Sequence, residues 1–182
     1  MRAKKFWIVL AIVAVVSLIV WLIVWQNKRD DRPFNQYDFP ETINITNTTD
    51  HDRADTMCMV LANKILDLDT LNMIIVYIPE VINEGEMEFF GIVQHIPFKT
   101  NQFVLLLNPK MSMSSLMETL SHEFVHIGQY IYGDLEVYPK YAKYAGDSIV
   151  FADVMYHNRT FEIEAFSQQS RINKELKRLL WN

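Results

Sequence analysis

The chain has a single cysteine and no excess of basic residues. Because Cys58 has no second cysteine to pair with, no disulfide can form within the chain, and the cysteine content gives no sign of an oxidising compartment. The 182 residues carry a formal net charge of −5, and the sequence pI is near 5.5. A nucleic-acid interface requires clustered Lys and Arg, so this acidic balance argues against a nucleic-acid-binding protein. The sequence contains no internal repeat.

Charged residues are also missing from residues 6–25, a run of 20 residues. This length is close to the roughly 20 residues that a helix needs to cross a hydrocarbon core, and tryptophans lie near both of its ends. A cleaved signal peptide is the alternative, but its apolar region usually has only about 7–15 residues and ends in small side chains. Here the run ends in Trp25, Gln26 and Asn27. We therefore predict a cytoplasmic basic flank and an uncleaved transmembrane anchor in residues 1–26.

The basic residues beside this run are evenly divided, so the positive-inside rule alone does not orient the helix. Three precede it and three follow it: Arg2, Lys4, Lys5, Lys28, Arg29 and Arg32. The free α-amino group and the absence of acidic residues before the run favour a cytoplasmic N-terminus. We expect a single-pass membrane protein with its folded domain outside the cytoplasm.

The rest of the chain divides into a linker and one small domain. Residues 27–52 are polar, contain Pro33 and Pro40, and are interpreted as a linker. Residues 53–182 suit a single domain, which we expect to be monomeric. Apolar spacing predicts a helix over 54–68, and short β-branched and aromatic runs predict four strands, at 71–78, 88–96, 102–107 and 149–155. The expected fold class is α+β, with a short mixed sheet packed on helices.

The most informative motif is His122–His126, a His-Glu-x-x-His sequence within residues 115–130. Apolar residues recur every three or four positions in this segment, and Ser115 and Glu118 have the spacing of a capping box, so we predict one helix that starts there. Residues four apart on a helix are neighbours, about 5–6 Å apart at Cβ, so one metal ion can bind both histidines. Glu123 would then face a metal-bound water. This layout is typical of a zinc hydrolase.

A catalytic zinc usually has three protein ligands, and a second predicted helix, over 161–180, offers two carboxylates. Glu162 and Glu164 are two residues apart, so they lie on roughly opposite sides of that helix. Glu162 shares its side with Ala165 and Phe166, as expected where two helices pack closely, whereas Glu164 shares its side with polar residues. We predict that Glu162 is the third ligand and keep Glu164 as the alternative.

Together these motifs resemble the gluzincin metallopeptidases. The resemblance covers roughly residues 105–169: His122–His126, then Gln129, and, 36 residues after the second histidine, the Glu-x-Glu-Ala sequence of Glu162–Ala165. It is greatest for small members whose second helix opens with that sequence. The resemblance implies a zincin-like domain with a closing C-terminal helix. It also implies zinc bound by His122, His126 and Glu162, with Glu123 as the general base.

The chain departs from better-known gluzincins at one position. In those proteins an Asp often follows four residues after the third ligand and orients a histidine. Here that residue is Phe166, or Gln168 if Glu164 is the ligand. Thr119 and Gln129 lie one turn from the histidines and are the other residues that could orient a ligand.

Two further roles remain open in the sequence. Four residues could donate a hydrogen bond to a developing oxyanion, and nothing in the sequence chooses among them: Tyr132, Tyr138, Tyr156 and His157. By resemblance, the strand over residues 103–107 would be an edge strand that pairs with an extended substrate.

We therefore expect a membrane-anchored zinc metallopeptidase that hydrolyses a peptide or protein substrate. Glu123 is its expected catalytic base, and His122, His126 and Glu162 are its expected ligands for Zn²⁺. The alternative is a non-catalytic, membrane-anchored binding module with a structural or vestigial metal site. A structural zinc site has four protein ligands, and the spacing of the other histidines and of Cys58 signals no fourth ligand.

Overall fold

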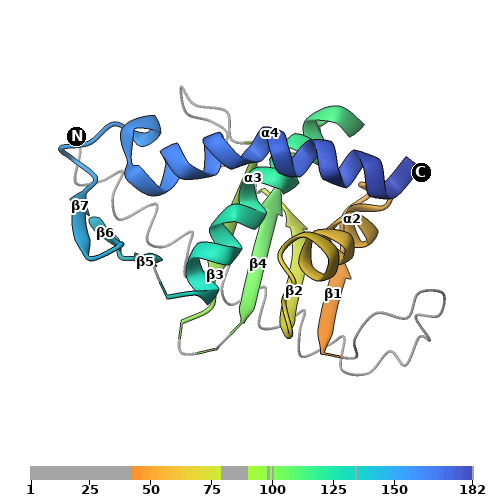
Figure 1. Cartoon of the computed structure of the whole chain (residues 1–182), viewed down its shortest axis with the longest axis horizontal. Coiled ribbons are helices and arrows are strands. Elements are labelled where there is room, and N and C mark those ends of the chain that lie inside the picture. The colour runs from red at the N-terminus through yellow and green to blue at the C-terminus, as the bar shows by residue number, and fades with distance from the viewer. Residues whose placement is uncertain (1–41, 79–89, 98, 100, 134, 182) are drawn as a thin grey trace. The chain divides into compact units, whose positions relative to one another are not determined.

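The computed structural model describes residues 42–78, 90–97, 99, 101–133 and 135–181, all within one structural unit, Phe39–Asn182. These residues form a mixed α+β domain with three α-helices and seven strands in two sheets (Figure 1). The larger sheet has four strands in the order β1-β2-β4-β3. It is a mixed sheet, because β1, β2 and β4 are parallel and β3 is antiparallel to β4.

The first strand lies within the range that the sequence indicated as linker. β1 (Ile43–Asn47) pairs in parallel with β2 (Leu71–Tyr77), with Ile43 opposite Leu71. Only one face of β1 packs on the core, so Ile43 is buried while the alternate Asn44 and Thr46 are exposed. A half-buried strand of alternating Ile and Asn or Thr has a polar composition, which explains why it was interpreted as linker.

The prediction that residues 103–107 form the edge strand is wrong. β4 (Gln102–Leu107) lies in the middle of the sheet between β2 and β3, and among the described strands β3 (Gly91–His95) is the edge strand on that side. At the two ends of β3, the carbonyl of Phe90 accepts a hydrogen bond from the N–H of Asn108, and the N–H of Ile96 donates one to the carbonyl of Gln102. Because such bonds alternate along an antiparallel pair, the backbone N–H and C=O groups of Gly91, Val93 and His95 point to the open edge.

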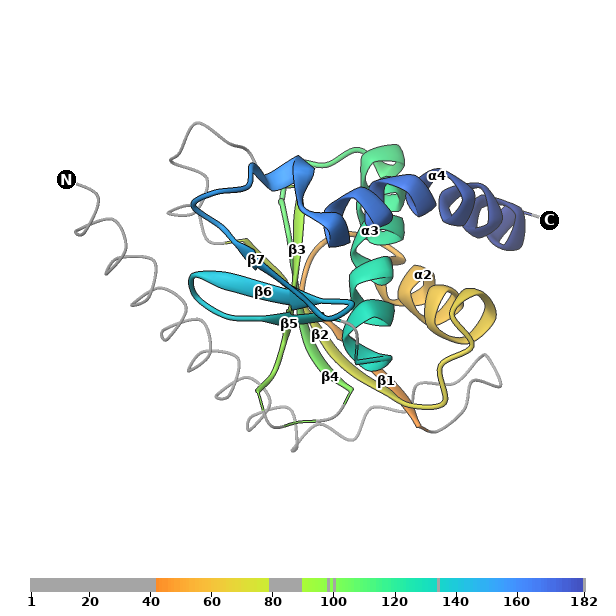
Figure 2. The ribbon, with the colours of Figure 1, turned by 60° about the vertical axis from the view of Figure 1, so that its left-hand side comes forward.

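Two helices place the motif residues against this sheet. α3 (Met113–Ile131) lies on the sheet together with α2 (Ala54–Val60), and α4 (Thr160–Trp181) packs along α3 (Figures 1 and 2). α2 continues into a π-helical turn, Leu61–Ile65. One hydrophobic core joins them, with members from α3, α4 and the sheet such as Leu116, Leu120, Phe124, Ala165, Ile172, Phe103 and Leu105.

The start of α3 differs from the predicted one. Ser112 is the N-cap residue, with extended backbone angles, and its hydroxyl accepts a hydrogen bond from the backbone N–H of Ser115 at 3.1 Å. The helix therefore begins two residues before Ser115, and the capping box predicted from Ser115 and Glu118 does not form. Ser112, three residues before Ser115, supplies the same kind of cap. A serine can do so wherever the backbone N–H three residues after it is free to donate.

The smaller sheet lies between the two motif helices in the sequence. It is an antiparallel meander of β5 (Leu135–Val137), β6 (Tyr141–Tyr144) and β7 (Asp147–Val150). The strand predicted over 149–155 is therefore misplaced, and a 3₁₀ turn, Tyr156–Asn158, leads into α4. The meander has its own small core, which Phe161 of α4 joins, together with Leu135, Ala142 and Ile149.

The described residues contain no helix that is long and apolar enough to cross a membrane. α3 and α4 have 19 and 22 residues, but Glu118 and Glu123 interrupt the first, and seven acidic and basic side chains are spread along the second. This finding corrects the prediction of an N-terminal transmembrane helix and of a single-pass membrane location. Both predictions were based on residues 1–26, which lie outside the described residues.

Substitution of Gly91 by Ala is expected to destabilise the domain. A Cβ atom at Gly91 would lie 2.4 Å from Cγ2 of Thr119 and 3.3 Å from Cγ of Glu123, so β3 and α3 would have to move apart. We expect a loss of about 1–3 kcal/mol in the free energy of unfolding, measured by urea denaturation of the full chain.

Gly128→Ala is the matched control for this prediction. A Cβ there meets nothing closer than 3.9 Å, and Gly128 lies inside α3, so alanine should stabilise the domain by about 0.5–1 kcal/mol. Equal effects of the two substitutions would contradict the close approach of β3 to α3.

Candidate metal centre and its two clefts

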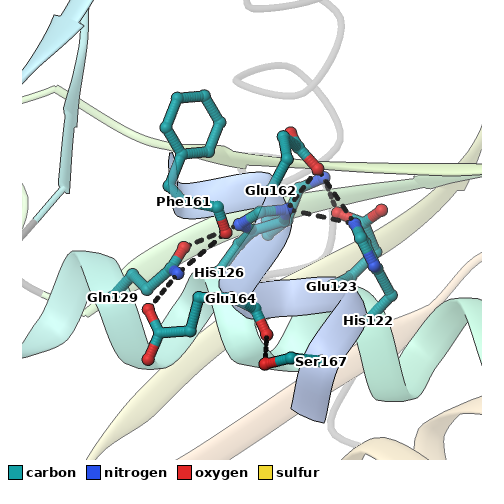
Figure 3. Close-up of polar contacts among 9 residues, drawn as sticks. His122, Glu123, His126, Gln129, Phe161, Glu162, Glu164 and Ser167 are labelled. Atoms are coloured by element: carbon teal, nitrogen blue, oxygen red, sulfur yellow. Dashed lines mark hydrogen bonds and ion pairs between the residues drawn. The ribbon is translucent and has the colours of Figure 1, made fainter. Parts of the chain in front are cut away.

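The two motif histidines lie side by side in the middle of α3, as the sequence predicts. His122 and His126 are 7% and 6% exposed, and their Nε2 atoms are 3.2 Å apart. Both rings are covered by the first turns of α4, which Figure 3 shows in front of α3. The spacing of four residues places them on one side of the helix, the side on which α4 packs.

Glu162 completes the cluster, as predicted. Its Oε2 atom lies 3.2 Å from Nε2 of His122 and 3.4 Å from Nε2 of His126 (Figure 3). Burial on its own raises the pKa of this carboxyl, but the hydrogen bonds with the two histidines outweigh burial and lower the pKa to about 2. The side chain is therefore ionised at any physiological pH. Two imidazoles and a carboxylate that meet at one buried point can hold a metal ion.

Glu164, the alternative ligand, points elsewhere. One of its carboxylate oxygens accepts hydrogen bonds from Nε2 of Gln129 at 2.8 Å and from the hydroxyl of Tyr144, and the other accepts one from Gln168 at 2.8 Å. Tyr144 belongs to β6, so Glu164 links α4 to the small sheet and to α3. Glu164 thus lies outside the cluster of His122, His126 and Glu162, but it fixes the amide group of Gln129.

Gln129 determines which nitrogen of His126 is free. Its amide nitrogen donates to the backbone carbonyl of Phe161 at 3.1 Å and to Glu164, so its amide oxygen must face His126 (Figure 3). That oxygen is 2.8 Å from Nδ1 of His126, which therefore carries the proton and donates. In the neutral ring the Nε2 atom then has a free lone pair directed at the cluster. Gln129, one of two residues proposed to orient a ligand, does so.

His122 has no such support. Its Nδ1 atom is buried and has no hydrogen-bond partner among the described residues. The ring packs instead against Phe166, with the ring centroids 4.6 Å apart. Phe166 occupies the position at which better-known gluzincins often have an Asp. An apolar ring contact therefore replaces the hydrogen bond that an Asp would make. Thr119, the other proposed orienting residue, contacts the sulfur of Met111 at 3.7 Å.

Glu123 lies beside the cluster and is held by the edge strand. Its Oε2 atom accepts a hydrogen bond from the backbone N–H of Val93 at 2.8 Å, and the side chain is 6% exposed. Burial raises the pKa of this carboxyl, and the charges of His126 and His122 together with the Val93 hydrogen bond offset only part of that effect. Glu123 is therefore a stronger base than an exposed glutamate, as a general base requires.

Two clefts open on either side of Glu123. The first, of about 330 Å³, is lined by residues from the start of α3 and from α4, including Ser115, Thr119, His122, Phe166 and Gln169. The second, of about 200 Å³, is lined by β3, β5 and the approach to α4, including Val93, Leu135, Phe151, Arg159 and Glu162. Gly91, Glu123 and Tyr156 line both clefts. A bound peptide that passed through both clefts would therefore run along β3 and cross the cluster of His122, His126 and Glu162.

Of the four residues considered for oxyanion binding, only Tyr156 lines these clefts. Tyr132 is 66% exposed and donates to the backbone of Leu66, and Tyr138 donates to Glu136. His157 lines neither cleft. Burial and the charges of Glu162 and Glu123 raise the pKa of Tyr156, so its phenol keeps its proton and remains a donor.

Sequence reasoning missed two contributors to the site. One is the pair of backbone positions Gly91 and Val93 on the edge strand, and the other is the link from Glu164 to Tyr144. A glycine inside a strand pattern signals close approach of the backbone to something else, so Gly91 could have been found. No local signal indicates the Tyr144 contact, because it depends on how the small sheet packs on α4.

Glu→Gln substitutions at the two positions test which carboxylate belongs to the cluster. Glu162→Gln removes a charge that contacts both histidines, so we expect the affinity for Zn²⁺ to fall by more than about 100-fold. Glu164→Gln disturbs only the support of Gln129, so we expect a loss of about tenfold. Competition with a chromophoric chelator measures both. Glu175→Gln, at an exposed pair with Arg178, is the control, and a larger loss for Glu164→Gln would contradict the assignment.

Metal affinity should fall as pH is lowered through neutrality. Burial lowers the pKa of His126, but its hydrogen bond to Glu162 and the charges of Glu123 and Glu162 outweigh it, so the pKa is raised above the ordinary value of 6.5. A metal binds only the neutral ring, so below that raised pKa each displaced proton costs about tenfold in affinity per pH unit. Zn²⁺ titrations between pH 8 and 5.5 measure this, and an affinity that is constant over that range would contradict it.

No protein-family model, no curated protein and no solved structure matches the chain. Its function is therefore inferred from the residues of this site and their geometry.

Proposed function

We propose that the domain is a zinc-dependent peptidase. The observation that carries the proposal is the meeting of three buried ligand atoms, from His122, His126 and Glu162, directly beside the buried carboxylate of Glu123. A metal cluster with a carboxylate base next to it has the parts required for hydrolysis by an activated water.

The spacing of the ligand atoms supports zinc. Zn²⁺ binds nitrogen and carboxylate oxygen at about 2.0–2.2 Å in a tetrahedron, so its ligand atoms lie roughly 3.3–3.5 Å apart. The three separations here are 3.2, 3.2 and 3.4 Å. A set of two imidazoles and one carboxylate is also a donor set that catalytic zinc uses.

An open coordination position supports catalysis over a structural role. Among the described residues, the cluster contains only these three ligand residues, whereas a structural zinc site normally has four. Both clefts reach the cluster, so a water and a substrate have access to it. The alternative, a non-catalytic binding module, gains no specific support from the contacts of the site.

The proposed substrate is a peptide bound in an extended conformation along β3. The outward N–H and C=O groups of the edge strand can pair with such a chain, and the two clefts would receive side chains on either side of the scissile bond. Among the described strands, β3 pairs only with β4, so the other edge of β3 can pair with a substrate peptide.

Within this arrangement each residue has a defined task. Glu123 takes a proton from the attacking water and passes it to the leaving amine as the C–N bond breaks. In the free protein the N–H of Val93 holds its carboxylate. The phenol of Tyr156, which stays protonated, donates to the oxygen that gains negative charge. Zinc, when bound, would polarise the scissile carbonyl and bring the pKa of a water near 7.

Glu123→Gln separates metal binding from catalysis. The amide keeps the size of the side chain but removes the base, so we expect unchanged zinc content and a loss of about 100- to 10,000-fold in kcat for hydrolysis of a peptide library. Zinc content is measured by elemental mass spectrometry, and cleavage by mass spectrometry of the products. Glu175→Gln again serves as the control with the same chemical change outside the site.

Two results would overturn the proposal. Retained cleavage by the zinc-loaded Glu123→Gln protein would exclude Glu123 as the base. A folded, zinc-loaded wild-type chain that cleaves no peptide in the library would favour the binding module instead.

A further inference from the structure

The second cleft contains an arginine that the proposed reaction does not use. Arg159 precedes α4 and lines this cleft together with Glu123 and Glu162, and no other Lys or Arg lines either of the two clefts. The position of Arg159 is fixed by its backbone, because its N–H bonds to the carbonyl of Tyr156 and its carbonyl accepts from the N–H of Ile163. Its guanidinium is therefore presented from a rigid turn.

The guanidinium of Arg159 is packed on aromatic rings and lacks a carboxylate. Its central carbon lies 4.2 Å from the ring centroid of Phe151 and 5.4 Å from that of Tyr156. Among the described residues no Asp or Glu forms an ion pair with it, and its buried Nε atom has no hydrogen-bond partner. A buried donor without an acceptor is unfavourable, so this geometry calls for an acceptor from outside the described residues, and a bound ligand can supply one.

The chemistry of the cleft indicates which acceptor fits. A guanidinium is planar and offers a fork of N–H groups, which matches the two oxygens of a carboxylate. The remaining walls include apolar side chains, such as Leu135, Val137 and Phe161, which suit the methylene groups of a short acidic side chain. The negative charge of Glu162 is engaged by the two histidines, so it opposes such a ligand less than an unpaired carboxylate would.

We propose that the second cleft is a specificity subsite in which Arg159 binds a carboxylate of the peptide substrate next to the scissile bond. This inference rests on the proposed peptidase function, because it assigns the substrate class of the same site. The carboxylate comes either from the side chain of Asp or Glu or from the free C-terminus of the peptide. Both sources present the same group to the same fork.

The experiment uses the full chain, loaded with zinc, and four versions of each test peptide. The two residues that flank the cleavage site are both Glu or both Gln, and each of these peptides is made as a C-terminal acid and as a C-terminal amide. For the wild type we expect kcat/KM to be about 10- to 100-fold higher for peptides with the recognised carboxylate, as typical of a charged hydrogen bond. A preference that follows Glu over Gln assigns the side chain, and one that follows acid over amide assigns the C-terminus.

Arg159→Gln should remove this preference by lowering kcat/KM for the carboxylate peptides alone. Arg159→Lys keeps the charge without the planar fork of N–H groups, so it should retain part of the preference. It also provides a folded variant for the test if Arg159→Gln does not fold. Lys177→Gln, an equal loss of charge on the exposed face of α4, should change nothing. Equal loss for acidic and neutral peptides in the Arg159 variants, or an unchanged preference in both, would overturn the proposal.

A binding measurement keeps this test separate from catalysis. Calorimetric titration of the zinc-loaded Glu123→Gln protein with the same peptides should show the carboxylate preference without turnover, and Arg159→Gln in that background should abolish it. If no peptide is cleaved by the wild type, the peptidase proposal fails, whereas this titration still decides whether Arg159 selects a carboxylate. Equal affinity for the acidic and neutral peptides in the titration would overturn the subsite.

Discussion

The structure depends on the burial of two carboxylates and two imidazoles at one point between α3 and α4. Glu123 and Glu162 would repel each other in an interior of low polarity, so the cluster requires positive charge to be stable. A proton on His126 would provide it in the chain alone, and the hydrogen bond to Glu162 and the charges of Glu123 and Glu162 raise the pKa of this histidine. A divalent cation would provide it better, because it would satisfy the ligand atoms of His122, His126 and Glu162 together.

The surroundings of the cluster direct each group toward that point. The carbonyl of Phe161 and the carboxylate of Glu164 fix the amide of Gln129, and Gln129 fixes the tautomer of His126. Because Tyr144 of β6 also bonds to Glu164, the small sheet contributes to the orientation of His126 through Glu164 and Gln129. On the other side, the phenyl ring of Phe166 positions His122 by packing alone. Both histidines contact Glu162, and outside the cluster one is supported by a polar contact and the other by an apolar one.

Local patterns in the sequence were sufficient for the part of the site that lies within single helices. The spacing of His122 and His126 follows from the helical repeat, and Glu162 was distinguished from Glu164 by the small Ala165 on its side, which is fully buried where α4 meets α3. Strand order could not be obtained in this way. The choice of β4 over β3 as the edge strand was wrong because pairing is set by contacts distant in the sequence. The strand β1 was missed because three of its five residues are polar.

The edge strand joins substrate binding to the basicity of Glu123 in the proposed peptidase. The N–H of Val93 points to the open edge, where it now bonds to Glu123, and this bond lowers the pKa of that carboxyl. An extended peptide that paired with β3 would compete for the same N–H. Loss of the bond would free the second carboxylate oxygen and raise the pKa of Glu123 further, because the burial that already raises it would remain. Pairing of the peptide with β3 would thus make Glu123 a stronger base at the moment when the scissile bond lies beside it.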